Sequence, residues 1–100
     1  MSEQKFNADL FLEALDKGVD SAFKRLTSEI MKEGALSAND KALITLACSV
    51  AVRCETCVER HKKIAISTGA SREDMLEAAA IARLVCMGSG FNTAATLLIE

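Results

Sequence analysis

Two cysteines and the chain's only histidine fall within eight residues, in the stretch CETCVERH at positions 54–61. On a helix, Cys54, Cys57 and His61 occupy positions i, i+3 and i+7 and share one face, because successive residues are rotated by about 100°. Thiols three residues apart in the first turn of a helix approach within disulfide reach, as in CxxC redox motifs. The spacing therefore predicts a redox-active cysteine pair with an imidazole one turn away.

The start of a helix also favours thiol chemistry. Its unpaired N–H groups and its macrodipole stabilise a thiolate, so we expect the pKa of both cysteines to be lowered. His61 lies four residues after Cys57 and can take or return a proton directly or through one water. These residues together predict a nucleophilic thiolate, a resolving thiol and a proton shuttle, which is chemistry that requires no bound cofactor.

Two other interpretations of the motif stay open. Helical cysteines are often no more than small buried hydrophobic residues. A structural zinc site usually needs four protein ligands, and the motif supplies three, so Cys48 or Cys86 would have to be the fourth. Both of these cysteines lie inside apolar segments, where we expect Cys48 to be buried and Cys86 to be similar, although the glycines after it could leave it more accessible. We predict no metal site.

The remaining sequence indicates the elements that hold the motif. A chain of 100 residues is the size of one domain, which we place at residues 1–100. Half of its residues are hydrophobic, only four are aromatic, and proline is absent. This composition suits close-packed helices better than a sheet, so we predict an all-α fold of five to six helices.

Capping residues and glycines suggest where these helices begin and end. We expect Gly88 and Gly90 to interrupt the chain before its last helix. The first predicted helix is capped by Asn7 and ends near Gly18, and the second covers about 20–33. The third is opened by Ser37 and Asp40, and the fourth runs from CETCVERH to about Thr68, with Gly69 as its cap. The fifth is opened by Ser71 and Asp74, and the sixth covers 91–100.

Charge and hydrophobicity narrow the class of partner. The net charge is −2 and acids and bases are mixed, so no basic stripe is present to bind nucleic acid. The first residues show no signal-peptide pattern, and no run of 18 uninterrupted apolar residues predicts a membrane helix, so we expect a soluble, cytoplasmic protein. Residues 42–52 and 76–87 are almost wholly apolar, which is more than a small chain can cover. We therefore predict a homo-oligomer.

The motif and its flanks together resemble a known family. CETCVERH, preceded by LITLACSVAV and followed by KKIAISTGASREDMLEAAAIA, is similar to the alkylhydroperoxidase D-like branch of the carboxymuconolactone decarboxylase family, over about residues 34–88. The resemblance implies an all-helical trimer or hexamer that reduces hydroperoxides. Cys57 would be oxidised to a sulfenic acid, Cys54 would condense with it, His61 would relay protons, and an external dithiol would restore both thiols. The helix dipole alone favours attack by Cys54, so the order stays open.

One position departs from the family pattern. Redox members of the branch carry a glutamate twelve residues before the first cysteine, and this chain has Ala42 there. Asp40 lies two residues earlier, on another face of the helix. We expect a thiol–disulfide oxidoreductase that acts on hydroperoxides. The alternatives are a carboxymuconolactone decarboxylase-like enzyme, which does not depend on a CxxC pair, and a non-enzymatic helical assembly or metal-binding module.

Overall fold

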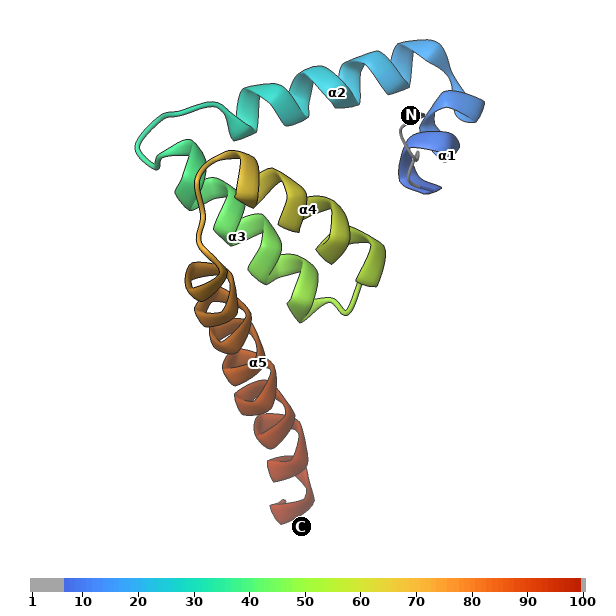
Figure 1. The fold of residues 1–100 in the computed structure, drawn as a ribbon. Helices are drawn as coiled ribbons and strands as arrows, with labels where there is room; N and C mark the ends of the chain where they lie inside the picture. The colour runs from blue at the N-terminus through green and yellow to red at the C-terminus, as the bar shows by residue number, and fades with distance from the viewer. Residues whose placement is uncertain (1–6, 100) are drawn as a thin grey trace. The chain divides into compact units, whose positions relative to one another are not determined.

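The computed structural model describes residues 7–99, and these residues form helices and no strand, which confirms the predicted all-α fold (Figure 1). Their contacts divide the chain into two compact units, one ending at Ala35 and one beginning at Leu36. The single-domain organisation stays a prediction. The elements are α1 (Asn7–Leu15), α2 (Lys17–Met31), α3 (Ala38–Ala51), α4 (Glu55–Ser67), α5 (Arg72–Ala94) and a short 3₁₀ helix, η1 (Ala95–Leu98).

In the first unit α1 packs on α2, and the break between them falls at Asp16. The Asp16 carboxylate accepts a hydrogen bond from the Val19 N–H at 3.0 Å and so caps α2. The predicted break near Gly18 is therefore wrong, because a strong capping residue two positions earlier starts the helix and leaves Gly18 inside it. The predicted cap at Asn7 is also wrong, since Asn7 is itself helical.

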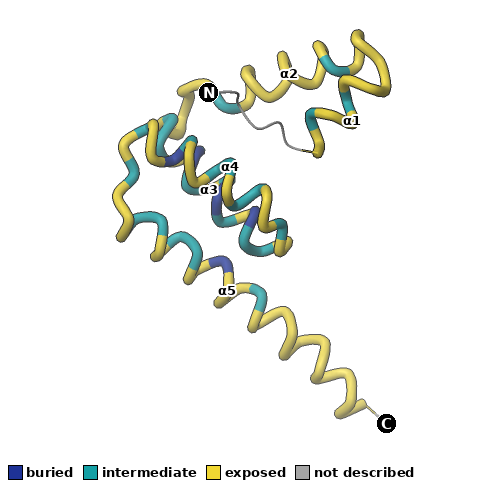
Figure 2. The backbone as a smooth tube through the Cα atoms, turned by 45° about the vertical axis from the view of Figure 1, so that its right-hand side comes forward, coloured by how far each residue is buried: buried dark blue, intermediate teal, exposed yellow. Residues whose placement is uncertain are grey.

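In the second unit α3 is the central helix, and it packs against both α4 and α5 (Figure 1). Most of the side chains that are buried in this unit are small, and α3 supplies the largest share of them (Figure 2). Small side chains allow helix axes to come close together. The buried residues are Ala42, Leu46, Ser49, Ala65 and Ala82.

The caps of this second unit follow the predicted pattern. The Ser37 hydroxyl accepts a hydrogen bond from the Asp40 N–H at 3.0 Å and opens α3. At the start of α5, Ser71 and Asp74 form a complete capping box, in which each side chain accepts from the other residue's N–H at 3.0 Å. Gly69 follows the end of α4 with a φ of 99°, the left-handed conformation that glycine adopts without strain.

α5 continues through Gly88 and Gly90 to Ala94, so the predicted interruption is wrong. Glycine weakens a helix by about 1 kcal/mol relative to alanine, but unlike proline it keeps the N–H that the helix needs. The last predicted segment is thus the end of α5 followed by η1.

The second half of α5 and the residues that follow it leave many large apolar side chains exposed. The segment Arg72–Leu98 is long and apolar enough, by length and composition alone, to cross a membrane, and little of it is buried in the structure. An isolated helix of this kind is weak support for a membrane span, because core helices of soluble proteins meet the same criteria. The exposed set includes Leu84, Val85, Met87, Phe91, Leu97, Leu98 and Ile99.

Candidate functional site: a cysteine pair at the start of α4

A tight turn between α3 and α4 positions the first cysteine. The Arg53 N–H donates to the Val50 carbonyl at 3.1 Å, and Arg53 has a φ of 59°, in the left-handed region. The Cys54 N–H then donates to the Ser49 carbonyl at 3.1 Å. The chain reverses within a few residues, so Cys54 lies directly beside the last turn of α3.

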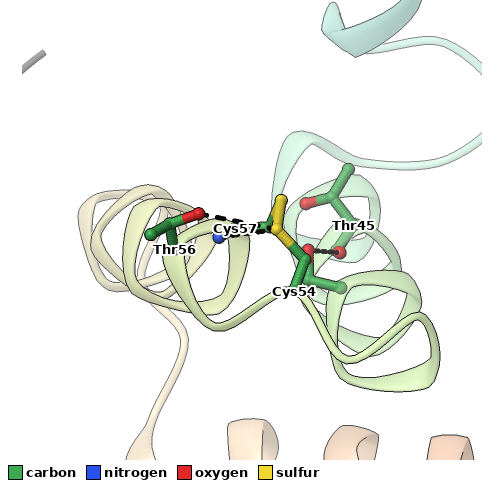
Figure 3. Close-up of a disulfide and its surroundings, with 5 residues drawn as sticks. Thr45, Cys54, Thr56 and Cys57 are labelled. Atoms are coloured by element: carbon green, nitrogen blue, oxygen red, sulfur yellow. Dashed lines mark hydrogen bonds between the residues drawn. A yellow bond between two sulfur atoms is a disulfide. The ribbon is translucent and has the colours of Figure 1, made fainter. Parts of the chain in front are cut away.

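Cys54 is the N-terminal cap of α4, and Cys57 is the third residue of that helix. The Cys54 sulfur accepts a hydrogen bond from the Cys57 N–H at 3.3 Å and contacts the Thr56 hydroxyl oxygen at 3.6 Å. The two cysteines form a disulfide, with their Cα atoms 5.1 Å apart (Figure 3). That separation lies within the usual range for disulfides, so the backbone of a helix start brings the sulfurs together as the spacing predicted.

His61 lies one turn beyond Cys57 in α4 and is half-buried. Its Nδ1 atom is buried and has no hydrogen-bond partner among the described residues. Burial, and secondarily the positive charge of Arg60, lower the pKa of His61 from its ordinary value of 6.5. The imidazole is therefore neutral at neutral pH and is able to accept a proton.

The two faces of α4 differ in their exposure to solvent. Glu55, Glu59 and Lys63 are exposed. Cys57 and His61 are half-buried, and several apolar residues further along the helix share their partial burial. The sulfurs and the ring thus belong to the face of α4 that turns toward the protein.

Ala42, at the position of the missing glutamate, is fully buried in α3. Beyond it, α3 carries two hydroxyl groups that sequence reasoning did not single out. The Thr45 hydroxyl donates to the Ala42 carbonyl and the Ser49 hydroxyl donates to the Thr45 carbonyl, both at 2.8 Å. Figure 3 shows Thr45 beside the disulfide. In the sequence, the sign of these two groups was a pair of hydroxyl residues spaced one helical turn apart in a largely apolar segment.

The other two cysteines, Cys48 and Cys86, form no disulfide. Cys48 is exposed, so its predicted burial is wrong. The reason is rotational, because α3 buries Leu46 and Ser49, and Cys48 falls outside their stripe. Cys86 is half-buried and its thiol donates to the Ala51 carbonyl at 3.6 Å. Within residues 7–99, no three His, Cys, Asp or Glu side chains gather in a way that could hold a metal ion.

An apolar groove of about 200 Å³ lies next to the motif, between α3, α4 and α5. Leu46, which follows Thr45 in α3, and Val58, which follows Cys57 in α4, line this groove. Lys62 and Arg72 also border it. The groove therefore occupies the neighbouring row of side chains on both helices. It is suited to an alkyl group.

A disulfide at the first turn of a partly exposed helix, with a histidine one turn on, describes a small helical protein that carries a cysteine pair. Residues 17–100 match the sequence profile of the carboxymuconolactone decarboxylase family. The chain belongs to this family, which includes the alkylhydroperoxidase D-like proteins.

Two relatives cover most of the chain. A Paracoccus denitrificans protein named "Uncharacterized protein 4 in cox locus" is 33% identical over an alignment of 85 residues, and the match covers 82% of this chain and 77% of that protein. The crystal structure of a Methanobacterium thermoautotrophicum protein is similar with a TM-score of 0.84 and 42% identity, and the match covers 92% of this chain and 99% of that one.

Proposed function

We propose that this protein is a thiol–disulfide oxidoreductase that reduces alkyl hydroperoxides through Cys54 and Cys57. The observation that carries the proposal is the disulfide between the cap and the third residue of α4. Both cysteines are half-buried and not fully enclosed, so a small oxidant and a reductant can reach them. The cycle below alternates between this disulfide and the dithiol.

In the oxidising half of the cycle, the Cys57 thiolate attacks one oxygen of the hydroperoxide and the O–O bond breaks. The alkoxide that leaves takes up a proton and departs as an alcohol, and Cys57 becomes a sulfenic acid. The Cys54 thiolate then attacks the Cys57 sulfur, the S–S bond forms, and hydroxide leaves and is protonated to water. An external dithiol returns two electrons by thiol–disulfide exchange.

His61 is the proton carrier in this scheme. Its lowered pKa keeps the ring neutral near pH 7, so it can accept the proton of the Cys57 thiol and return it to the leaving oxygen. No carboxylate stands at Ala42 to orient the ring, which agrees with the unpartnered Nδ1. We therefore expect slower peroxide turnover than a site with a histidine held by a carboxylate would give.

Three further properties belong to the same proposal. The exposed apolar residues of α5 and η1, among them Phe91 and Leu98, form the contact between subunits of a homo-oligomer, either a trimer or a hexamer. The protein works in the cytoplasm, where dithiol donors keep its cysteine pair reduced between turnovers. The groove bordered by Leu46 and Val58 receives the alkyl group of the hydroperoxide.

The test is a count of free thiols before and after addition of an alkyl hydroperoxide to the reduced protein. We expect loss of two thiols per chain, with an intramolecular disulfide between Cys54 and Cys57 identified by mass spectrometry. Cys57→Ser should abolish peroxide consumption. Cys54→Ser should stop at a sulfenic acid on Cys57, which a carbon nucleophile such as dimedone traps.

The variants also separate the alternatives. Full and equal peroxide consumption in both single-cysteine variants would refute the assignment. Trapping of the sulfenic acid on Cys54 would keep the function and reverse the order of attack. Decarboxylation of a lactone by the double variant Cys54→Ser/Cys57→Ser would instead favour the decarboxylase-like alternative, because that chemistry does not depend on the pair.

A further inference from the structure

Two hydrogen bonds fix how α3 and α4 lie against each other. At one end the Cys54 N–H donates to the Ser49 carbonyl at 3.1 Å. At the other end the Thr68 hydroxyl donates to the Asn39 side-chain oxygen at 3.2 Å. The helices are therefore antiparallel over this whole length, and residues between Asn39 and Ser49 lie opposite residues between Cys54 and Thr68.

Thr45 lies in the middle of that stretch of α3. Because Asn39 faces Thr68 and Ser49 faces Cys54, the register places Thr45 opposite the part of α4 that carries Cys57 and His61. Figure 3 agrees, since Thr45 stands beside the disulfide. Thr45 is half-buried, whereas the other hydroxyl of this row, that of Ser49, is buried and donates to the Thr45 carbonyl at 2.8 Å.

In the oxidised protein the Thr45 hydroxyl has a backbone partner, the Ala42 carbonyl at 2.8 Å. That bond is easily exchanged, because a helical carbonyl has a second lone pair and keeps its own N–H partner four residues on. Threonine in a helix also has two accessible rotamers. A disulfide sulfur carries no charge and is a weak hydrogen-bond acceptor, so the hydroxyl keeps its bond to the Ala42 carbonyl. A thiolate is a much stronger acceptor.

We propose that in the reduced protein the Thr45 hydroxyl donates a hydrogen bond to the Cys57 thiolate. This role rests on the dithiol chemistry proposed above and adds a group from α3 to it. The bond stabilises the charged form of the sulfur that attacks the peroxide. It acts from the side of the site where Ala42 leaves no charged group.

The electrostatic surroundings of Cys57 leave room for such a donor. The residues of the α3 row that faces α4 are Asn39, Ala42, Thr45 and Ser49, and none of them titrates. On α4 the titratable groups of the same face are Cys54 and His61, and the cations of Arg60 and Lys62 stand on either side of His61 in sequence. From α5, Arg72 borders the groove on the neighbouring row. A hydroxyl is therefore the donor that α3 offers to the thiolate.

The experiment measures the rate of alkylation of Cys57 by iodoacetamide as a function of pH. The background is the full chain with Cys48, Cys54 and Cys86 replaced by serine, so that one thiol remains. Thr45→Val should move the midpoint of the profile upward by about one pH unit, which is about a tenfold slower reaction below the midpoint. Thr45→Ser keeps the hydroxyl and should keep the original midpoint.

A matched control comes from α5. The Thr93 hydroxyl donates to the Ser89 carbonyl one turn earlier, at 3.2 Å, so Thr93→Val removes the same kind of bond away from the site. It should leave the alkylation profile unchanged. If Thr45→Val fails to fold, comparison of Thr45→Ala with Thr45→Ser decides the question in the same assay.

An unchanged midpoint in Thr45→Val, or in Thr45→Ala, would overturn the proposal. The assay contains no peroxide, so its result is independent of the proposed activity. A shifted midpoint in a protein that consumes no hydroperoxide would keep the role of Thr45 and refute the peroxidase function. If the protein consumes hydroperoxide but the midpoint does not shift, the peroxidase function stands and the role of Thr45 is refuted.

Discussion

The first turns of α4 and α5 have the same local arrangement with different atoms. In α5 the cap is Ser71 and the third helical residue is Asp74, and the two exchange hydrogen bonds of 3.0 Å between side chain and backbone. In α4 the cap is Cys54 and the third residue is Cys57. The Cys54 sulfur accepts from the Cys57 N–H at 3.3 Å, but the second side chain forms a disulfide in place of a returning hydrogen bond.

The difference shows what position fixes and what residue type adds. A cap and the third residue after it approach each other in any helix that starts this way. With a hydroxyl and a carboxylate the result is a stable helix end, whereas with two thiols it is a covalent bond that can be made and broken. Sulfur accepts hydrogen bonds weakly, so α4 gives up part of the capping energy that α5 keeps. The site thus trades stability for reactivity.

The largest effect is expected from moving the pair to the other helix. In a chain with Cys54→Ser and Cys57→Ser, the substitutions Ser71→Cys and Asp74→Cys create a second CxxC at an equivalent start. A disulfide should form there with a thiol oxidant, because the positions match. Its oxidation by an alkyl hydroperoxide should be at least about a hundredfold slower than that of the native pair, since no histidine follows. Time courses of thiol loss measure both.

The control for that transplant restores the histidine. Ala78 lies seven residues after position 71, as His61 does after Cys54. Adding Ala78→His to the transplanted pair should recover part of the lost rate. A transplant that reacts with peroxide as fast as the native pair, with alanine at position 78, would mean that His61 contributes nothing to the chemistry.

The comparison also explains which features could be read from the sequence. The cap of α5 and the approach of the two cysteines depend on residues three apart, and such local geometry follows from the sequence directly. The exposure of Cys48 depends on which stripe of α3 meets its neighbours, and the role of Thr45 depends on the register between α3 and α4. Both are tertiary properties. The run of α5 through Gly88 was missed because a glycine weakens a helix without ending it.

A smaller effect is expected on stability when the two caps are exchanged. Ser71→Cys should lower the free energy of unfolding by about 1 kcal/mol, because a good acceptor is lost from the start of α5. Cys54→Ser should raise it by about 0.5 to 1 kcal/mol relative to the reduced wild type, because serine caps α4 better. Urea unfolding in excess reductant measures both changes. Equal and unchanged midpoints would show that the sulfur caps α4 as well as a hydroxyl would.

The smallest effect is a pH dependence that only the α4 region should show. His61 is the one histidine of the chain, and its pKa is lowered in the folded protein by burial and by Arg60. As the pH falls below the ordinary value of about 6.5, the unfolded chain binds a proton before the folded one does. The stability that a neutral His61 permits is thus fully present above that value and is lost as the pH falls through the lowered pKa.

The matched variant is His61→Gln, which keeps a polar side chain that does not titrate. Urea midpoints of the reduced proteins, measured between about pH 7.5 and about pH 4.5, should converge or cross as the pH falls, because only the wild type loses stability through this group. The carboxylates titrate in both chains and cancel in the difference. A difference that stays constant over this range would mean that the pKa of His61 is the same in the folded and the unfolded chain. His61 would then take part in the thiol chemistry with an ordinary proton affinity.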